Sequence, residues 1–103
     1  MVQTFRKKKV EIVVEASRAR AIIDMIEAAG AKGYTTIPNV SGRGNRGTRD
    51  EAHLSDVFGN VMIIVVAAEK IASMILEQSQ GLLENYAGIV MVSDVEVIRD
   101  EHF

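Results

Sequence analysis

The sequence contains no cysteine and no tryptophan, and it has only one proline, two tyrosines and three phenylalanines among 103 residues. The lack of cysteine excludes disulfides, thiolate catalysis and thiolate metal sites. No apolar run approaches the roughly 20 residues that a membrane-spanning helix needs. The basic stretch Phe5–Lys9 runs into a strand-like segment rather than into a signal-peptide core. We therefore expect a cytoplasmic protein without direct membrane insertion, recruited to a membrane only through a partner.

The charge and composition of the chain also limit its possible functions. The net charge of −2 gives the chain as a whole no electrostatic reason to bind nucleic acid. A content of 48% hydrophobic and 25% charged residues is typical of a globular protein. The length of 103 residues predicts a single domain, residues 1–103, with one modest core.

The first half of the chain predicts a strand, a helix and a second strand. Val10–Glu15 is rich in β-branched residues and is typical of a strand. A helix is expected to follow, with Ser17 as its N-cap and Gly30 near its end. The stretch Tyr34–Val40 predicts a second strand, and its single proline places that strand at an edge of the sheet. The apolar positions with helical spacing are Ala19, Ile22, Ile23, Ile26 and Ala29.

The second half repeats this order. Val61–Val66 is a continuous apolar run and predicts a buried strand. A helix is expected from Glu69 to about Tyr86, weakened or ended by Gly81. Ile89–Val92 predicts a further strand, which 95–98 either extends or follows as a separate short strand. The positions expected on the inner side of the second helix are Ile71, Met74, Ile75 and Leu82.

This order of elements, β-α-β followed by a long loop and β-α-β, predicts an α+β fold. It corresponds to the ferredoxin-like βαββαβ sandwich, with four antiparallel strands and two helices on one face of the sheet. The strands carry apolar residues at nearly consecutive positions, so both faces of the sheet require burial. Because the helices cover only one face, we expect the other to be buried by oligomerisation.

The segment 41–60 between the two halves is the most polar part of the chain. Loops of this length in small domains are usually functional or disordered. Glycines allow backbone amides to approach an anion, and arginines bind phosphate with forked hydrogen bonds. A phosphate site and a merely solvated loop are both consistent with this pattern. The residues concerned are Gly42, Arg43, Gly44, Arg46, Gly47 and Arg49.

No catalytic or metal site is expected. The two histidines, His53 and His102, match no metal-binding spacing, and surface positions account for them better. No serine lies in a nucleophile-elbow context. The sequence therefore predicts a protein that is not an enzyme.

Three segments together resemble the PII signalling superfamily: Gly30–Thr35, Gly42–Arg46 and Asn85–Ile89. The resemblance extends from Val10 to Phe103 and is greatest to the SbtB-like and carboxysome-associated PII branch. It implies a homotrimer with inward-facing sheets, an adenine nucleotide between neighbouring subunits, and a T-loop at about residues 41–60.

The resemblance also assigns residues to the site. Thr48 and Arg49 are assigned to bicarbonate or to a protein partner. The residues assigned to the nucleotide are Gly33, Tyr34, Thr35, Gly42, Arg43, Gly44, Asn45, Arg46, Ala87, Gly88, Ile89 and Arg99.

The chain also departs from the nitrogen-regulatory members. The B-loop, 85–88, is short and lacks their glycine-rich, lysine-bearing stretch, and fewer cations near the distal phosphates favour ADP or AMP over ATP. Cyclic AMP is a further candidate. A bicarbonate-responsive site and a membrane bicarbonate transporter as target follow by analogy with the branch. Two alternatives stay open: a small acylphosphatase-like phosphohydrolase, and a structural trimer without ligand.

Overall fold

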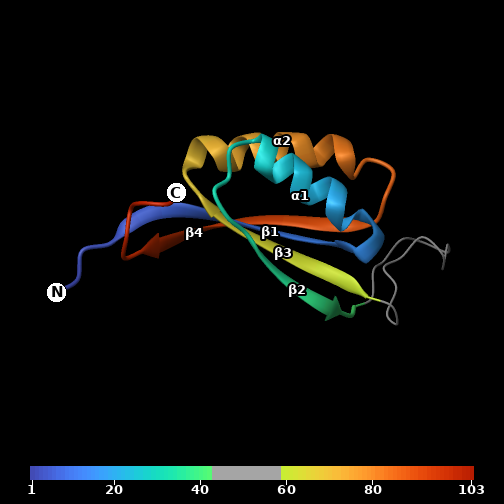
Figure 1. The fold of residues 1–103 in the computed structure, drawn as a ribbon, viewed down its shortest axis with the longest axis horizontal. Helices are drawn as coiled ribbons and strands as arrows, with labels where there is room; N and C mark the ends of the chain where they lie inside the picture. Colours follow the sequence, from blue (N-terminus) through green and yellow to red (C-terminus); the bar gives the residue numbers. More distant parts are fainter. Residues whose placement is uncertain (43–58) are drawn as a thin grey trace.

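A computed structural model describes residues 1–42 and 59–103 of the chain. The elements are β1 (Phe5–Glu15), the 3-10 turn η1 (Ala16–Arg18), α1 (Ala19–Ala28), β2 (Thr35–Val40), β3 (Asn60–Ala67), α2 (Glu69–Leu82) and β4 (Gly88–Val97). The strands form one sheet in the order β2-β3-β1-β4, with all neighbours antiparallel. Both helices lie on the same face of this sheet (Figure 1). The ferredoxin-like α+β fold is therefore confirmed.

The core lies between the helices and one face of the sheet. In β1, Val10, Ile12 and Val14 are fully buried, and they pair across the sheet with alternate residues of β3. Because successive side chains of a strand point to opposite faces, these residues define the helix-covered face. The buried side chains of the helices that meet them are Ile22, Ile23, Met25, Ile26, Ala72 and Ile75.

The other face of the sheet carries a second set of apolar side chains, here called the open face. Val13 and its cross-strand partners Met62 and Ile89 lie on it. Three residues of the open face remain 43–49% exposed, namely Ile37, Ile89 and Met91. The prediction that both faces of the sheet require burial is thus matched by an apolar face that residues 1–42 and 59–103 leave partly exposed.

The strand boundaries differ from those expected. β1 begins at Phe5, five residues before the predicted start, because Lys7, Lys8 and Lys9 pair with β4 and, from Lys8 on, with β3. Residues 88–97 form one continuous strand, so the last segment extends β4 rather than forming a separate strand. Pro38 lies in β2, an edge strand, and the pairing with β3 shifts register between Ile37 and Val40, as expected for proline in a ladder.

The helices also correct three expectations. Ser17 does not cap α1: it lies within η1, and the N-cap position is Arg18, without a side-chain cap hydrogen bond. α2 ends at Leu82, directly after Gly81 and short of Tyr86. Met74 was expected on the inner side of α2, but it is 41% exposed and lines an open groove between α1 and α2. Gly30, with φ of +104°, follows α1 as predicted.

Candidate functional site

The first group of predicted site residues lies at the start of β2. Gly33, Tyr34 and Thr35 line a pocket of about 270 Å³. Thr35 pairs with Ile64, so the pocket opens on the open face of the sheet. The other lining residues are Lys32, Ile64, Val66, His102 and Phe103. An apolar floor with aromatic and backbone groups at its rim suits a flat, heteroaromatic base.

The C-terminal residues form one wall of this pocket because the chain turns back after β4 (Figure 1). Lys7 Nζ lies 2.6 Å from a carboxylate oxygen of Asp100 and 5.8 Å from the centre of the Phe103 ring. The Lys7 side chain is 12% exposed and that of Asp100 is 60% exposed, so only the lysine end of this ion pair is shielded from water. His102, which lies between Asp100 and Phe103 in the sequence, also lines the pocket and has a left-handed backbone conformation with φ of +78°.

The second group lies where β2 ends and β3 begins. Gly42 follows β2, and Gly59 precedes β3 with φ of +94°. The side-chain amide of Asn60, a residue 1% exposed, donates a hydrogen bond of 3.1 Å to the carbonyl of Val40. The backbone N–H of Ala16 donates another, also of 3.1 Å, to the carbonyl of Gly59. Both ends of the predicted T-loop are therefore tied to the sheet and to η1.

The third group follows α2 on the opposite edge of the sheet. Ala87 and Gly88 lead into β4, and a Cβ at Gly88 would lie 3.2 Å from side-chain atoms of Val14 and Leu83. A larger residue at this position would therefore require the side chains of Val14 and Leu83 to shift by a few tenths of an ångström. Ile89 lies on the open face. Tyr86 stacks with Arg18, whose guanidinium carbon is 3.5 Å from the ring centre.

The structure does not bring these groups together within one chain. Thr35 begins β2 and Gly42 follows its end seven residues later, a separation of up to about 24 Å at roughly 3.4 Å per residue. Gly42 and Gly88 lie at the same end of the sheet but on opposite edges, three strand spacings or about 14 Å apart. Arg99 is exposed and follows the far end of β4 from Gly88. A ligand that contacts all three groups needs residues from more than one chain.

Several predicted residues lie outside the described part of the chain. They are Arg43, Gly44, Asn45, Arg46, Thr48, Arg49 and His53. Sequence reasoning also missed two residues that the structure brings close to the predicted groups: Lys7 at the end of the sheet where β2 begins, and Arg18 at the opposite end, beside Tyr86. The residues around each of them in the sequence give no sign of such a role, because the contact partners, Tyr86 and Asp100, come from the other end of the chain.

Two negative findings concern residues 1–42 and 59–103. They contain no group of three or more histidine, aspartate or glutamate side chains placed to hold a metal ion. Neither helix in that part of the chain is long and apolar enough to cross a membrane.

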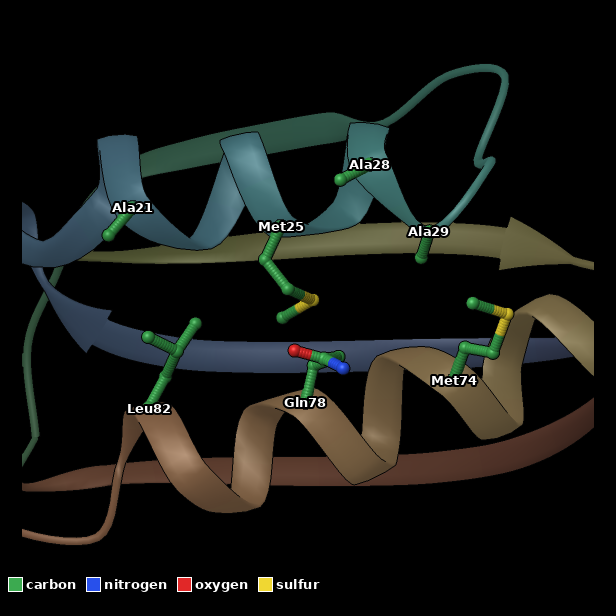
Figure 2. A pocket seen from close by; sticks show the side chains of 7 residues that line it. All are labelled: Ala21, Met25, Ala28, Ala29, Met74, Gln78 and Leu82. Atoms are coloured by element: carbon green, nitrogen blue, oxygen red, sulfur yellow. The ribbon is translucent and has the colours of Figure 1, made fainter.

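A further pocket lies between the helices and holds none of the predicted site residues. It measures about 320 Å³, and Met25, Gln78 and Leu82 point into it from α1 and α2 (Figure 2). The remaining lining residues are Ala21, Ala28, Ala29 and Met74. No ionisable side chain lines this groove, so it lacks the cations that a phosphate group needs.

Comparison with known proteins agrees with this fold. The sequence model of the family described as Nitrogen regulatory protein P-II matches residues 7–102. The chain therefore belongs to the P-II family, a family of regulatory proteins, and the predicted resemblance is confirmed.

The chain is also similar to solved structures of PII-like proteins. CPII, a PII-like protein from Thiomonas intermedia solved with ADP and bicarbonate, is 35% identical, with a TM-score of 0.81 and coverage of 96% of this chain and 95% of CPII. The same protein with ADP, AMP and bicarbonate gives 31% identity, a TM-score of 0.81 and coverage of 96% and 94%. GlnK of B. subtilis in complex with ATP shares 20% identity, with a TM-score of 0.64 and coverage of 87% and 84%, which supports the fold alone.

Proposed function

We propose that this chain is a PII-like sensor that forms a homotrimer, binds ADP or AMP between subunits together with bicarbonate, and is not an enzyme. The observation that carries the proposal is its 35% identity, over nearly the whole chain, to CPII solved with ADP and bicarbonate. The pocket beside Gly33, Tyr34 and Thr35 offers an apolar floor and aromatic rim for the adenine base.

The trimer is supported by the open face. Ile37, Ile89 and Met91 are each more than 40% exposed there, and association of sheets would remove them from water. The same association would bring the edge that carries β2 in one subunit toward the edge that carries β4 in the next. This arrangement accounts for a site whose residues are divided between two edges of one sheet.

The preference for ADP or AMP over ATP rests on charge. The loop 83–87 between α2 and β4 carries no lysine or arginine, and Glu84 adds a negative charge. Each further phosphate group needs additional donors to offset its charge. We therefore expect affinity to fall from ADP to ATP, and we include cyclic AMP as a candidate because it carries one phosphate.

The regulatory step is proposed for the T-loop, at about residues 41–60. Nucleotide would contact Gly42 and the arginines that follow it, Thr48 and Arg49 would meet bicarbonate or the target, and the loop conformation would set affinity for that target. The target proposed is a membrane transporter of bicarbonate, to which the cytoplasmic trimer is recruited. The physiological setting is inorganic-carbon uptake, as in the carboxysome-associated branch.

Calorimetric titration tests the proposal directly. The purified trimer is titrated with AMP, ADP, ATP and cyclic AMP, each with and without bicarbonate. We expect ADP or AMP to bind most tightly and bicarbonate to increase the affinity. The same preparation is assayed for hydrolysis of ADP and of an acyl phosphate. Absence of nucleotide binding, or steady turnover of either compound, would replace the proposal with one of the alternatives.

A further inference from the structure

The turn η1 presents an arginine in an unusual setting. The guanidinium carbon of Arg18 lies 3.5 Å from the centre of the Tyr86 ring, a distance that places the two planar groups face to face. In this arrangement the ring occupies one face of the guanidinium group. The N–H donors point outward along its edge and stay available to another acceptor.

The charge of Arg18 is held in place but is not neutralised. Among residues 1–42 and 59–103, its guanidinium group makes no ion pair and no hydrogen bond. Two other cations of the chain differ: Lys8 Nζ lies 2.5 Å from a carboxylate oxygen of Asp94, and a guanidinium nitrogen of Arg20 lies 3.4 Å from one of Asp24. A positioned guanidinium group with open donors is the arrangement that binds carboxylate or phosphate in two-point contact.

Arg18 lies close to two segments proposed to contact the phosphates, the base of the T-loop and the loop before β4. The backbone of η1 is hydrogen-bonded to Gly59, at the C-terminal base of the T-loop. Tyr86 lies two residues before Gly88, the glycine that packs closely against Val14 of β1. The Arg18 side chain therefore lies where the base of the T-loop and the loop before β4 meet the same turn.

We propose that Arg18 is an additional phosphate-binding residue of the nucleotide site and that Tyr86 positions its guanidinium group. This inference rests on the proposed nucleotide-binding function. Arg18 supplies from η1 a cation that the loop 83–87 lacks. Its edge donors contact the phosphate group that is nearest to Gly88.

A series of ligands with increasing phosphate content tests this role. Adenosine, AMP and ADP are titrated into the wild-type protein, Arg18→Ala and the control Arg20→Ala. We expect Arg18→Ala to weaken ADP binding by about 10- to 100-fold, as for loss of a hydrogen-bonded charged contact, and to leave adenosine binding unchanged. Arg20→Ala removes the same charge two residues away, from an exposed position, and is expected to change ADP affinity by less than about two-fold.

Substitutions of Tyr86 test the positioning. Tyr86→Phe keeps the aromatic face and is expected to bind ADP like the wild type. Tyr86→Leu removes the stacking and is expected to weaken ADP binding by about two- to five-fold, again without effect on adenosine. Arg18→Lys keeps the charge but not the planar fork, so its ADP affinity is expected between those of the wild type and Arg18→Ala.

Different results would overturn the inference and the proposed function separately. If Arg18→Ala binds ADP like Arg20→Ala, Arg18 does not contact phosphate. If it loses adenosine and ADP affinity equally, Arg18 supports only the shape of the site. If the wild-type protein binds none of the three compounds, the proposed function itself fails, and the inference fails with it.

Discussion

Replacement of Met91 by glutamate tests whether the open face is the surface through which the chain assembles. Met91 is 43% exposed in the single chain, and its cross-strand partner on the same face is Glu11. In a trimer with inward-facing sheets, the new carboxylate would be buried directly opposite another carboxylate. Like charges in directly opposed positions are destabilising in antiparallel sheets.

The size of the effect follows from two contributions. Full burial of a methionine side chain is worth about 1.5–3 kcal/mol, so covering the exposed part of Met91 contributes about 1 kcal/mol per subunit. Burial of an unpaired carboxylate costs several kcal/mol more. Over three subunits the sum is on the order of 10 kcal/mol, which exceeds what a trimer could tolerate at micromolar concentration.

Light scattering after size-exclusion chromatography measures the result. The wild-type protein is expected at three times the chain mass of 11.3 kDa, and Met91→Glu at the monomer mass. Met74→Glu is the matched control, since Met74 is 41% exposed but lies on the helix layer, and this variant should remain trimeric. A trimeric Met91→Glu, with a circular dichroism spectrum like that of the wild type, would refute the assignment of the open face.

Two further predictions concern stability. Gly30 has φ of +104°, so Gly30→Ala should lower the free energy of unfolding in urea by about 1–2 kcal/mol; Gly81→Ala, with open space around the added methyl group, should instead raise it by about 0.5–1 kcal/mol. A loss at both positions would contradict the conformational argument. The hydrogen bond from Lys8, together with its charge, lowers the pKa of Asp94 below 3.8, and the pair in turn raises the pKa of Lys8. The pair therefore stabilises the fold above pH 3.8, and this contribution is lost as the pH falls through the lowered pKa of Asp94 and as it rises through the raised pKa of Lys8. NMR titration should show the pKa of Asp94 returning toward 3.8 in Lys8→Met; an unchanged value would exclude the pair as its cause.

The order of elements could be predicted from the sequence because each strand and helix carries its own periodic pattern. The start of β1 could not, since Lys7, Lys8 and Lys9 resemble a polar lead-in. Two of these lysines form ion pairs within the fold, Lys8 with Asp94 and Lys7 with Asp100. These carboxylates come from the other end of the chain, and no local window contains both partners.

Some residues of the candidate site could also be suggested from the sequence, and others could not. Gly33, Gly42 and Gly88 could be proposed as site residues from the resemblance, because glycine positions are visible in the sequence, and their role stays a prediction. Arg18 could not, since an arginine in a short turn resembles any surface cation until its stacking on Tyr86 is known. The Ser17 cap was wrong for a related reason: its residue type suits a cap, but the backbone enters α1 through a 3-10 turn.

The location of β2 and β4 on opposite edges of the sheet has a thermodynamic consequence. A ligand held by residues from both edges interacts with an assembly and hardly at all with a lone chain. Mass action then couples occupancy to protein concentration, so ligand drives subunits together and dilution releases ligand. In a cell, the total amount of this protein would then influence how much of such a ligand is bound, in addition to the level of the ligand itself.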